Sequence, residues 1–161
     1  MRESRMKRLV ALILAVAVAG GSAAASQAHN GRGHGGKHAG LELTYKKWTA
    51  PFPNMVGVVG GDIVGKFGGA VYTATPDAGG RVQISAIYIV IAPDASQSFT
   101  AHVEGGWAAS TTGKAVLDGH VVDGYLKGAR VHVKFDTVPC TESPDGTCYQ
   151  GTISVHRGSG H

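Results

Sequence analysis

From Leu41 onward, hydrophobic and polar positions alternate with a period of two residues through most segments of the chain. Because successive side chains of a strand point to opposite faces, this pattern predicts β-strands. Clusters of glycine, proline, aspartate and asparagine between the alternating segments mark turns. About eight strands are expected, over residues 41–45, 56–59, 65–75, 81–91, 98–104, 114–122, 130–136 and 149–156. No long segment carries the apolar stripe of an amphipathic helix, so helix should be minor.

Two of these segments predict how their faces are used. In 65–75, the alternation places Phe67, Val71 and Thr73 on one face and Tyr72 on the other. The segment 81–91 is apolar on both faces towards its end, as expected for a strand that is covered from both sides. One face of that strand is therefore expected to contact another subunit.

The strands are expected to form a single all-β domain over residues 41–161. Eight strands joined by short turns can close into an antiparallel barrel, which leaves no exposed strand edge. A two-sheet sandwich is the alternative architecture. Glycines inside strands suit the tight bends of a barrel and favour it over the sandwich. These glycines are Gly65, Gly68, Gly69, Gly119 and Gly151.

The N-terminus has the pattern of an export signal. Residues 1–8 are basic, residues 9–21 are apolar, and small residues follow up to Ala28. The apolar run is too short for a membrane-spanning helix, and the mature chain contains no transmembrane segment. We expect a signal peptide at 1–28, a flexible His/Gly-rich tail at 29–40, and a secreted, periplasmic or cell-envelope protein.

Removal of the signal peptide changes the charge balance. Residues 1–28 carry four of the 15 basic and one of the 11 acidic side chains, so the net charge falls from +4 to 11 − 10 = +1. The net positive charge comes mostly from the predicted signal peptide, so it does not predict binding of the mature protein to nucleic acid.

Cys140 and Cys148 are the two cysteines of the chain. An even count in an exported protein predicts a disulfide. A metal pair or a redox pair is the alternative, but the spacing matches neither a CxxC motif nor a zinc finger.

Four segments together resemble the bacterial allene oxide cyclase barrel-like proteins. They are VVGGDIVGKFGG at 58–69, FTAHVEGG at 99–106, TGKAVLDGHVVDGYLKGARVHVKF at 112–135 and CYQGTISV at 148–155. The resemblance covers roughly residues 55–156. It implies an eight-stranded barrel of the allene oxide cyclase and dirigent type, assembly as a dimer or trimer, and isomerase or cyclase activity. It carries over no catalytic residue.

A cyclisation site needs an apolar wall and one or two polar groups that polarise the substrate. The catalytic candidates are Asp118, His120, Asp62 and Glu104. Asp118 and His120 are two positions apart on one strand, so they point the same way and could act as an oriented acid and base. The competing interpretation is an exposed polar strip. The competing interpretation of Asp62 is a turn residue whose side chain is hydrogen-bonded to its own backbone.

Two tyrosines, Tyr72 and Tyr88, are the candidate ligand contacts. Packing in the core or at an interface is the alternative for both of them.

The tail histidines His29, His34 and His38 could bind a transition metal, but their glycine spacing offers no preformed geometry. Neither a Gly-x-Ser-x-Gly elbow nor a phosphate-binding glycine loop is present, and no cofactor is expected.

Taken together, these features of the sequence favour an exported barrel that binds a small apolar molecule, with isomerase or cyclase activity as the resemblance implies. The alternatives are a non-catalytic secreted or envelope protein that binds a partner through its outer surface, and metal sequestration by the tail.

Overall fold

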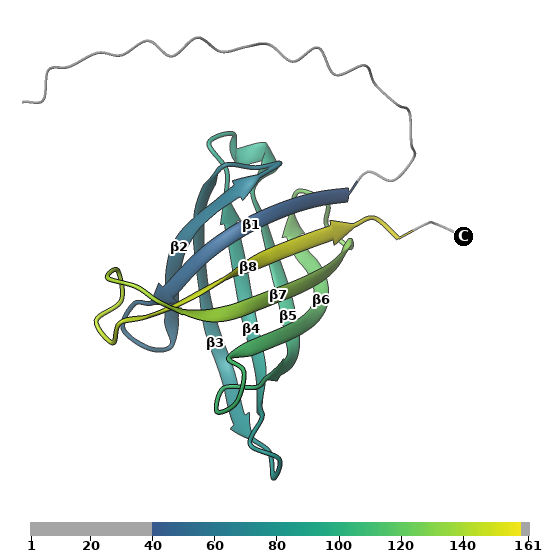
Figure 1. Cartoon of the computed structure of the whole chain (residues 1–161). Coiled ribbons are helices and arrows are strands. Elements are labelled where there is room, and N and C mark those ends of the chain that lie inside the picture. The colour runs from purple at the N-terminus through teal and green to yellow at the C-terminus, as the bar shows by residue number, and fades with distance from the viewer. Residues whose placement is uncertain (1–39, 159–161) are drawn as a thin grey trace, which may run out of the picture. The chain divides into compact units, whose positions relative to one another are not determined.

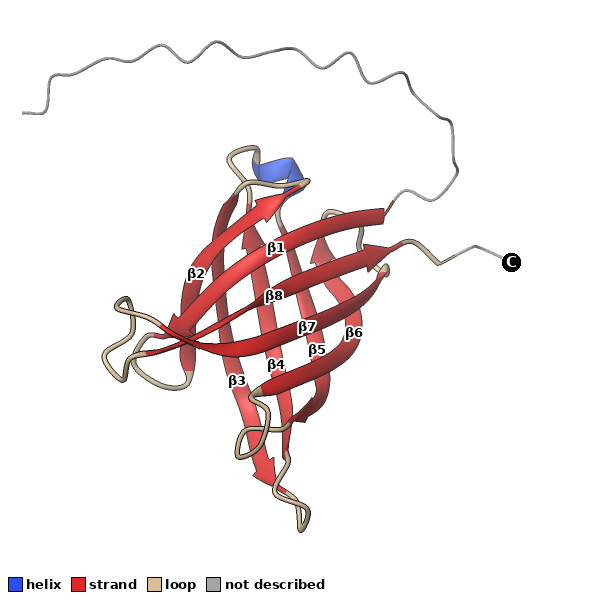
Figure 2. Ribbon diagram, viewed as in Figure 1, coloured by secondary structure: helices blue, strands red, loops and turns tan. Residues whose placement is uncertain are grey.

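The computed structural model describes residues 40–158, which form a closed antiparallel barrel of eight strands (Figure 1). Each strand pairs with the next along the chain, and β8 pairs with β1 to close the barrel. Within residues 40–158, the one helical element is the short 3-10 turn η1 (Ala95–Gln97), which is blue in Figure 2. The strands are β1 (Gly40–Thr49), β2 (Asn54–Gly61), β3 (Gly65–Pro76), β4 (Val82–Ile91), β5 (Phe99–Trp107), β6 (Lys114–Gly124), β7 (Arg130–Pro139) and β8 (Thr147–His156). The predicted all-β barrel with little helix is confirmed, and the sandwich alternative is wrong.

The two-residue alternation decides which side chains fill the interior. On β1, Leu43 and Tyr45 are buried, whereas Glu42 and Thr44, which alternate with them, are exposed. The partner strands of β1 place Ile153 of β8 opposite Leu43, and Ile153 is also buried. Inward-facing apolar side chains from all eight strands thus meet in one core, as expected for a small barrel.

The two ends of the barrel are built differently. The connections 50–53, 77–81, 108–113 and 140–146 lie at one end, which we call the mouth end. The other three connections and the outer ends of β1 and β8 lie at the far end, because consecutive antiparallel strands alternate in direction. At the far end the interior is filled by apolar side chains that are almost fully buried, among them Leu43, Val90, Phe99, Val121 and Val155.

A β-bulge in β3 changes the predicted faces of that strand. Its register against β4 shifts between Val71 and Thr73, which leaves Tyr72 66% exposed. The extra residue reverses the alternation, so that Thr73 is exposed rather than on the inward face of Phe67 and Val71. The prediction for Thr73 was therefore wrong, because sequence alternation does not reveal a bulge.

The predicted signal peptide and residues 29–39 of the predicted tail lie outside the described residues, as do His29, His34 and His38. Gly40, the last residue of the predicted tail, begins β1. Within residues 40–158, no helix is both long enough and apolar enough to cross a membrane.

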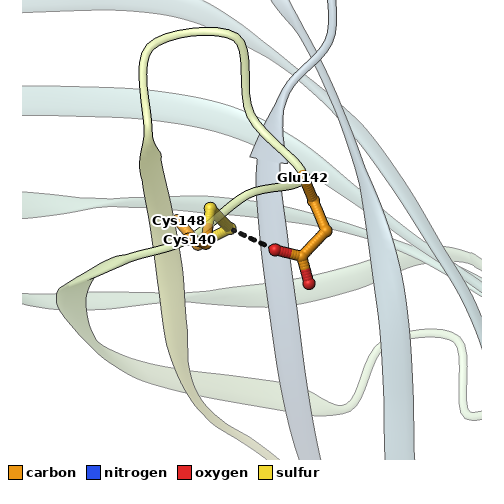
Figure 3. Close-up of side chains that lie close together, drawn as sticks. All are labelled: Cys140, Glu142 and Cys148. Carbon is orange, nitrogen blue, oxygen red and sulfur yellow. Dashed lines mark hydrogen bonds between the residues drawn. A yellow bond between two sulfur atoms is a disulfide. The ribbon is translucent and has the colours of Figure 1, made fainter.

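The predicted disulfide joins Cys140 to Cys148 across the last connection of the mouth end (Figure 3). Glu142 lies within this connection, and its carboxylate is 4.0 Å from the Cys148 sulfur and 2.6 Å from Lys46 Nζ on β1. Cys140, Glu142 and Cys148 lie close enough together to surround a metal ion. Since both sulfurs are in the disulfide, they offer no thiolate to a metal in this form.

Replacing Cys140 and Cys148 together by serine is expected to lower the free energy of unfolding by about 2–3 kcal/mol, since the unfolded chain loses a short closed loop. Urea denaturation of the double variant and of the wild-type protein measures the difference. Dithiothreitol should reduce the stability of the wild-type protein to a similar extent and leave the double variant unchanged. Equal stability of the oxidised and reduced wild-type protein would contradict the prediction.

Candidate functional site

A cavity of about 130 Å³ occupies the mouth end of the barrel interior. Its wall comes from seven of the eight strands and from the connection 50–53. Phe52 of that connection lines the cavity and is also 74% exposed, so the cavity reaches the surface beside this side chain. The lining residues are Lys47, Thr49, Phe52, Pro53, Asn54, Met55, Val71, Ala74, Ile84, Ala86, Tyr88, Trp107, Phe135 and Tyr149. The wall is mostly apolar and aromatic, which is the usual character of a small-molecule site.

Lys47 is the one charged residue that lines this cavity. It continues the inward row of β1 by one step beyond Tyr45, and only 4% of its surface is exposed. Its Nζ donates a hydrogen bond to the hydroxyl oxygen of Tyr88 on β4. None of the ion pairs formed within residues 40–158 includes Lys47. The amino group is thus buried without a carboxylate partner.

Five aromatic rings surround the Lys47 amino group. Its Nζ lies 4.2 Å from the centroid of the Tyr88 ring and 4.8 Å from that of Phe135. The rings of Tyr45, Phe67 and Tyr149 follow at 5.8, 5.7 and 5.7 Å. Ring faces at such distances attract an ammonium group and replace part of the hydration that burial removes. This arrangement explains how the barrel holds a lysine in its interior.

Burial changes the acid–base behaviour of the whole cluster. It lowers the pKa of Lys47 to about 7, because the charged form loses its water. Burial also raises the pKa of Tyr88 and of Tyr45, since both phenolates would be poorly solvated. At neutral pH, the site therefore holds lysine as a mixture of amine and ammonium beside tyrosines that stay protonated.

The hydroxyl of Tyr45 provides a further hydrogen-bonding group in the cluster. It is buried and has no partner among residues 40–158. The Tyr45 ring contacts Tyr88 with 6.0 Å between centroids and stacks on Phe67 at 5.6 Å. Tyr45 does not line the cavity itself, but the Lys47 amine and the Tyr88 hydroxyl do. An apolar wall that carries these two groups can hold an apolar molecule by its hydrocarbon part and bind one oxygen atom at the polar end.

Of the candidate residues predicted from the sequence, Tyr88 lines the cavity and the others do not. Tyr72 lies on the outside of β3, and Glu104, Asp118 and His120 lie on the outside of β5 and β6. Asp62 is exposed in the connection after β2, where its carboxylate accepts a hydrogen bond from the Glu42 backbone N–H. The catalytic roles of these residues stay predictions, and they would require a substrate on the outer surface.

Asp118 contacts His132 and not His120, the histidine with which the sequence predicted it to pair. Asp118 Oδ1 lies 2.7 Å from Nδ1 of His132, its direct neighbour on β7. His120 instead lies opposite His102 of β5, with 6.5 Å between the ring centroids. Glu104 is 3.6 Å from His102. The result is an exposed polar strip across β5, β6 and β7, as the competing interpretation described.

Sequence reasoning missed Lys47 and four of the five aromatic rings around it, those of Tyr45, Phe67, Phe135 and Tyr149. The alternation from Leu41 through Leu43 and Tyr45 reaches Lys47 at the next inward position, so the signal was present. This signal is weak, because a lysine next to Lys46 at a strand end is normally exposed.

Two further hollows lie on the outside of the barrel. One, of about 300 Å³, follows β6, β7 and β8, and the other, of about 620 Å³, extends over β1, β2 and β8. The exposed side chains of Asp136, Gln150 and Thr152 line both of them. These hollows lie on the open outer surface, in contrast to the aromatic cavity inside the barrel.

Comparisons with known proteins return no match: no family model matches the chain, and no curated protein or solved structure is significantly similar to it. What is shown of residues 40–158 is the architecture, a closed eight-stranded antiparallel barrel.

Proposed function

We propose that the barrel binds one small, mainly apolar molecule in the mouth-end cavity, with an oxygen atom of that molecule beside Lys47 and Tyr88. The observation that carries the proposal is the buried lysine, which lines the cavity and has no carboxylate partner there. Burying an amine is costly, and a lysine at this position contributes less to folding than an apolar side chain would. A binding role accounts for its presence.

The size of the cavity sets the size of the ligand. An enclosed apolar cavity of about 150 Å³ accommodates a benzene molecule, and this cavity measures about 130 Å³ and opens beside Phe52. A single ring or a short branched chain fits inside, and a longer tail would extend through the opening. The oxygen of a carbonyl, hydroxyl or carboxylate group would accept a hydrogen bond from the Lys47 amino group.

Filling the cavity tests the proposal. Ala86 on β4 is fully buried and lines the cavity, so Ala86→Leu places a larger side chain in the ligand's volume. We expect the wild-type protein to bind benzyl alcohol at one molecule per barrel, and Ala86→Leu to weaken binding by at least about tenfold, equivalent to about 1.4 kcal/mol. Isothermal titration calorimetry measures the affinity, and native mass spectrometry gives the stoichiometry.

Ala70→Leu is the matched control, because residue 70 lies on β3 but does not line the cavity. It should leave the affinity unchanged. Absence of binding to the wild-type protein, or equal binding by Ala86→Leu, would contradict the proposal.

Isomerase or cyclase activity is the catalytic form of this proposal, and it is what the resemblance to allene oxide cyclase barrels implies. Lys47 and Tyr88 are the residues suited to it, since one can exchange a proton near neutral pH and the other stays protonated. The aromatic wall would fold the substrate, while the hydrogen-bonded pair would polarise its oxygen.

Export and oligomer formation belong to the same proposal. The Cys140–Cys148 disulfide fits an exported protein, because disulfides persist in oxidising compartments.

On the outside of β2 and β4, the apolar side chains of Val56, Val58 and Ile91 are exposed. A second subunit would cover this face in a homo-oligomer.

The second candidate function is binding of a partner through the outer surface without catalysis. The apolar outer face and the two hollows on the outside of the barrel favour it. Retention of the partner by Ala86→Leu would distinguish this function from ligand binding in the cavity.

A further inference from the structure

The position of the Lys47 amino group allows a more specific conclusion about the ligand. A buried lysine usually faces a carboxylate, which keeps it protonated and unreactive. Lys47 faces a phenol and aromatic rings instead, and it lines a cavity that opens to the surface. Its amino group is therefore accessible to a molecule inside the cavity but shielded from bulk water.

We infer that Lys47 captures a small aldehyde or ketone covalently, as an imine between its Nζ and the carbonyl carbon of the ligand. The inference rests on the proposed function, because the carbonyl compound must occupy the cavity before it can react. It narrows the ligand class from molecules with any polar oxygen to carbonyl compounds.

The chemical step balances without any other reactant. The lone pair of the neutral Lys47 amine forms a bond to the carbonyl carbon, and the carbonyl π electrons move to oxygen. That oxygen takes up a proton, nitrogen releases one, and a carbinolamine results. The hydroxyl group then leaves with the remaining proton of nitrogen as water, which breaks the C–O bond, and the electron pair of the N–H bond forms the C=N double bond. One amine and one carbonyl compound thus give one imine and one water molecule, and hydrolysis reverses the reaction.

Tyr88 is placed to move the proton in this step. Its hydroxyl is hydrogen-bonded to Nζ and lines the same cavity, so it can donate to the carbonyl oxygen and recover a proton from nitrogen. Burial raises the pKa of Tyr88, which keeps the phenol protonated, and lowers the pKa of Lys47 to about 7, which supplies free amine at neutral pH.

The surroundings of Lys47 contain few other titratable groups. Tyr45 on β1, Tyr88 on β4 and Tyr149 on β8 face its amino group. Burial raises the pKa of all three tyrosines, so they remain neutral while Lys47 titrates. The remaining rings near Nζ belong to Phe67 and Phe135, which do not titrate.

Reductive trapping tests the inference on the intact protein. Benzaldehyde and sodium cyanoborohydride at pH 7.5 reduce any imine to a stable secondary amine, which mass spectrometry counts and peptide mapping locates. At this pH about three quarters of a lysine with a pKa near 7 is free amine, compared with about one in a thousand for an ordinary lysine. We expect one adduct per barrel, on Lys47, formed at least roughly tenfold faster than on any exposed lysine.

Three variants test whether the fast adduct forms on Lys47 and whether it requires the cavity. Lys47→Met should abolish the fast adduct, and Lys46→Met, at the neighbouring outward position, should retain it. Ala86→Leu keeps Lys47 but fills the cavity, so it should also lose the fast adduct. Mapping of the wild-type protein locates the adduct even if a variant fails to fold, and it separates Lys47 from the terminal amine.

Benzyl alcohol separates failure of the inference from failure of the proposed function. If benzyl alcohol binds in the cavity but benzaldehyde modifies only exposed lysines or the terminal amine, imine formation is overturned and reversible binding stands. If neither compound occupies the cavity, both proposals are overturned.

Discussion

Lys47→Met is expected to stabilise the folded barrel by about 2–4 kcal/mol at pH 6 and to have little effect near pH 9. In the folded protein, burial lowers the pKa of Lys47 from 10.5 to about 7. A shift of this size corresponds to about 5 kcal/mol at about 1.4 kcal/mol per pH unit. Methionine removes this cost but leaves the Tyr88 hydroxyl without its partner, which costs about 1–3 kcal/mol at every pH.

The pH dependence has a definite sign. Between pH 7 and 10.5 the unfolded chain carries a proton on Lys47 that the folded chain lacks, so the stability of the wild-type protein rises with pH in this window. The variant lacks the group, and its advantage therefore shrinks above pH 7. Urea denaturation of both proteins at pH 6, 7.5 and 9 measures the difference. The buried Tyr45 and Tyr88 lower the stability only above pH 10, outside this range.

Lys46→Met is the control for this experiment, because Lys46 is the neighbouring lysine but is paired with Glu142 near the surface. Its effect on stability should be small and nearly constant over the same pH range. A constant difference between Lys47→Met and the wild-type protein would mean that Lys47 stays protonated throughout. In that case the five ring faces would hold the ammonium form, and imine formation at neutral pH would lose its supply of free amine.

The sequence predicts the barrel well because strand alternation is a local property. On β1, inward-facing positions recur every two residues, as at Leu43 and Tyr45. The other strands show the same alternation. The disulfide is likewise predictable, since Cys140 and Cys148 are the two cysteines of the chain and lie eight positions apart. These predictions need no knowledge of how distant strands pair.

The candidate site is harder to predict because it depends on register and on side-chain volume. Asp118 contacts His132 across β6 and β7, a partner that only the pairing of the two strands defines. The bulge between Val71 and Thr73 changes which part of β3 faces inward, and nothing in the local alternation announces it. The cavity exists because the side chains at the mouth end do not fill the interior, which is a property of the closed barrel.

Lys47 is a separate case. The alternation of β1 places residue 47 in the inward row, whereas a lysine side chain is normally exposed. A lysine in an inward row is a conflict between the local pattern and the usual preference of the side chain for water. Such conflicts are expected where function, rather than stability, decides the residue. Continuing a strand pattern through a charged residue, instead of ending the strand there, would have identified the site.

Gly151→Ala is expected to destabilise the barrel by about 3 kcal/mol, the upper end of what overpacking costs. A Cβ atom at position 151 would lie 1.8 Å from the carbonyl oxygen of Lys134 and 2.7 Å from the Cα of Phe135, both on β7. These are backbone atoms, so relief requires β7 and β8 to move apart. Alanine restricts the unfolded chain more than glycine does, so a loss of stability must come from the clash. Urea denaturation followed by circular dichroism measures it.

Gly68→Ala is the matched control, because a Cβ atom there would meet nothing closer than Ile89 Cβ at 3.9 Å. Its effect should stay within about 0.5 kcal/mol. If Gly151→Ala were as stable as Gly68→Ala, then β7 and β8 would not approach as closely as the barrel requires.

Gly151 also connects the curvature of the barrel to the cavity. It lies opposite Phe135 on β7 and two positions after Tyr149, and both aromatic rings line the cavity beside Lys47. Separating the two strands would move these rings apart from their centroid distance of 5.5 Å. Gly151→Ala should therefore weaken binding of benzyl alcohol as well as lower stability, whereas Gly68→Ala should change neither. Loss of stability without loss of affinity would mean that the cavity depends on the aromatic side chains themselves and not on the close approach of β7 and β8.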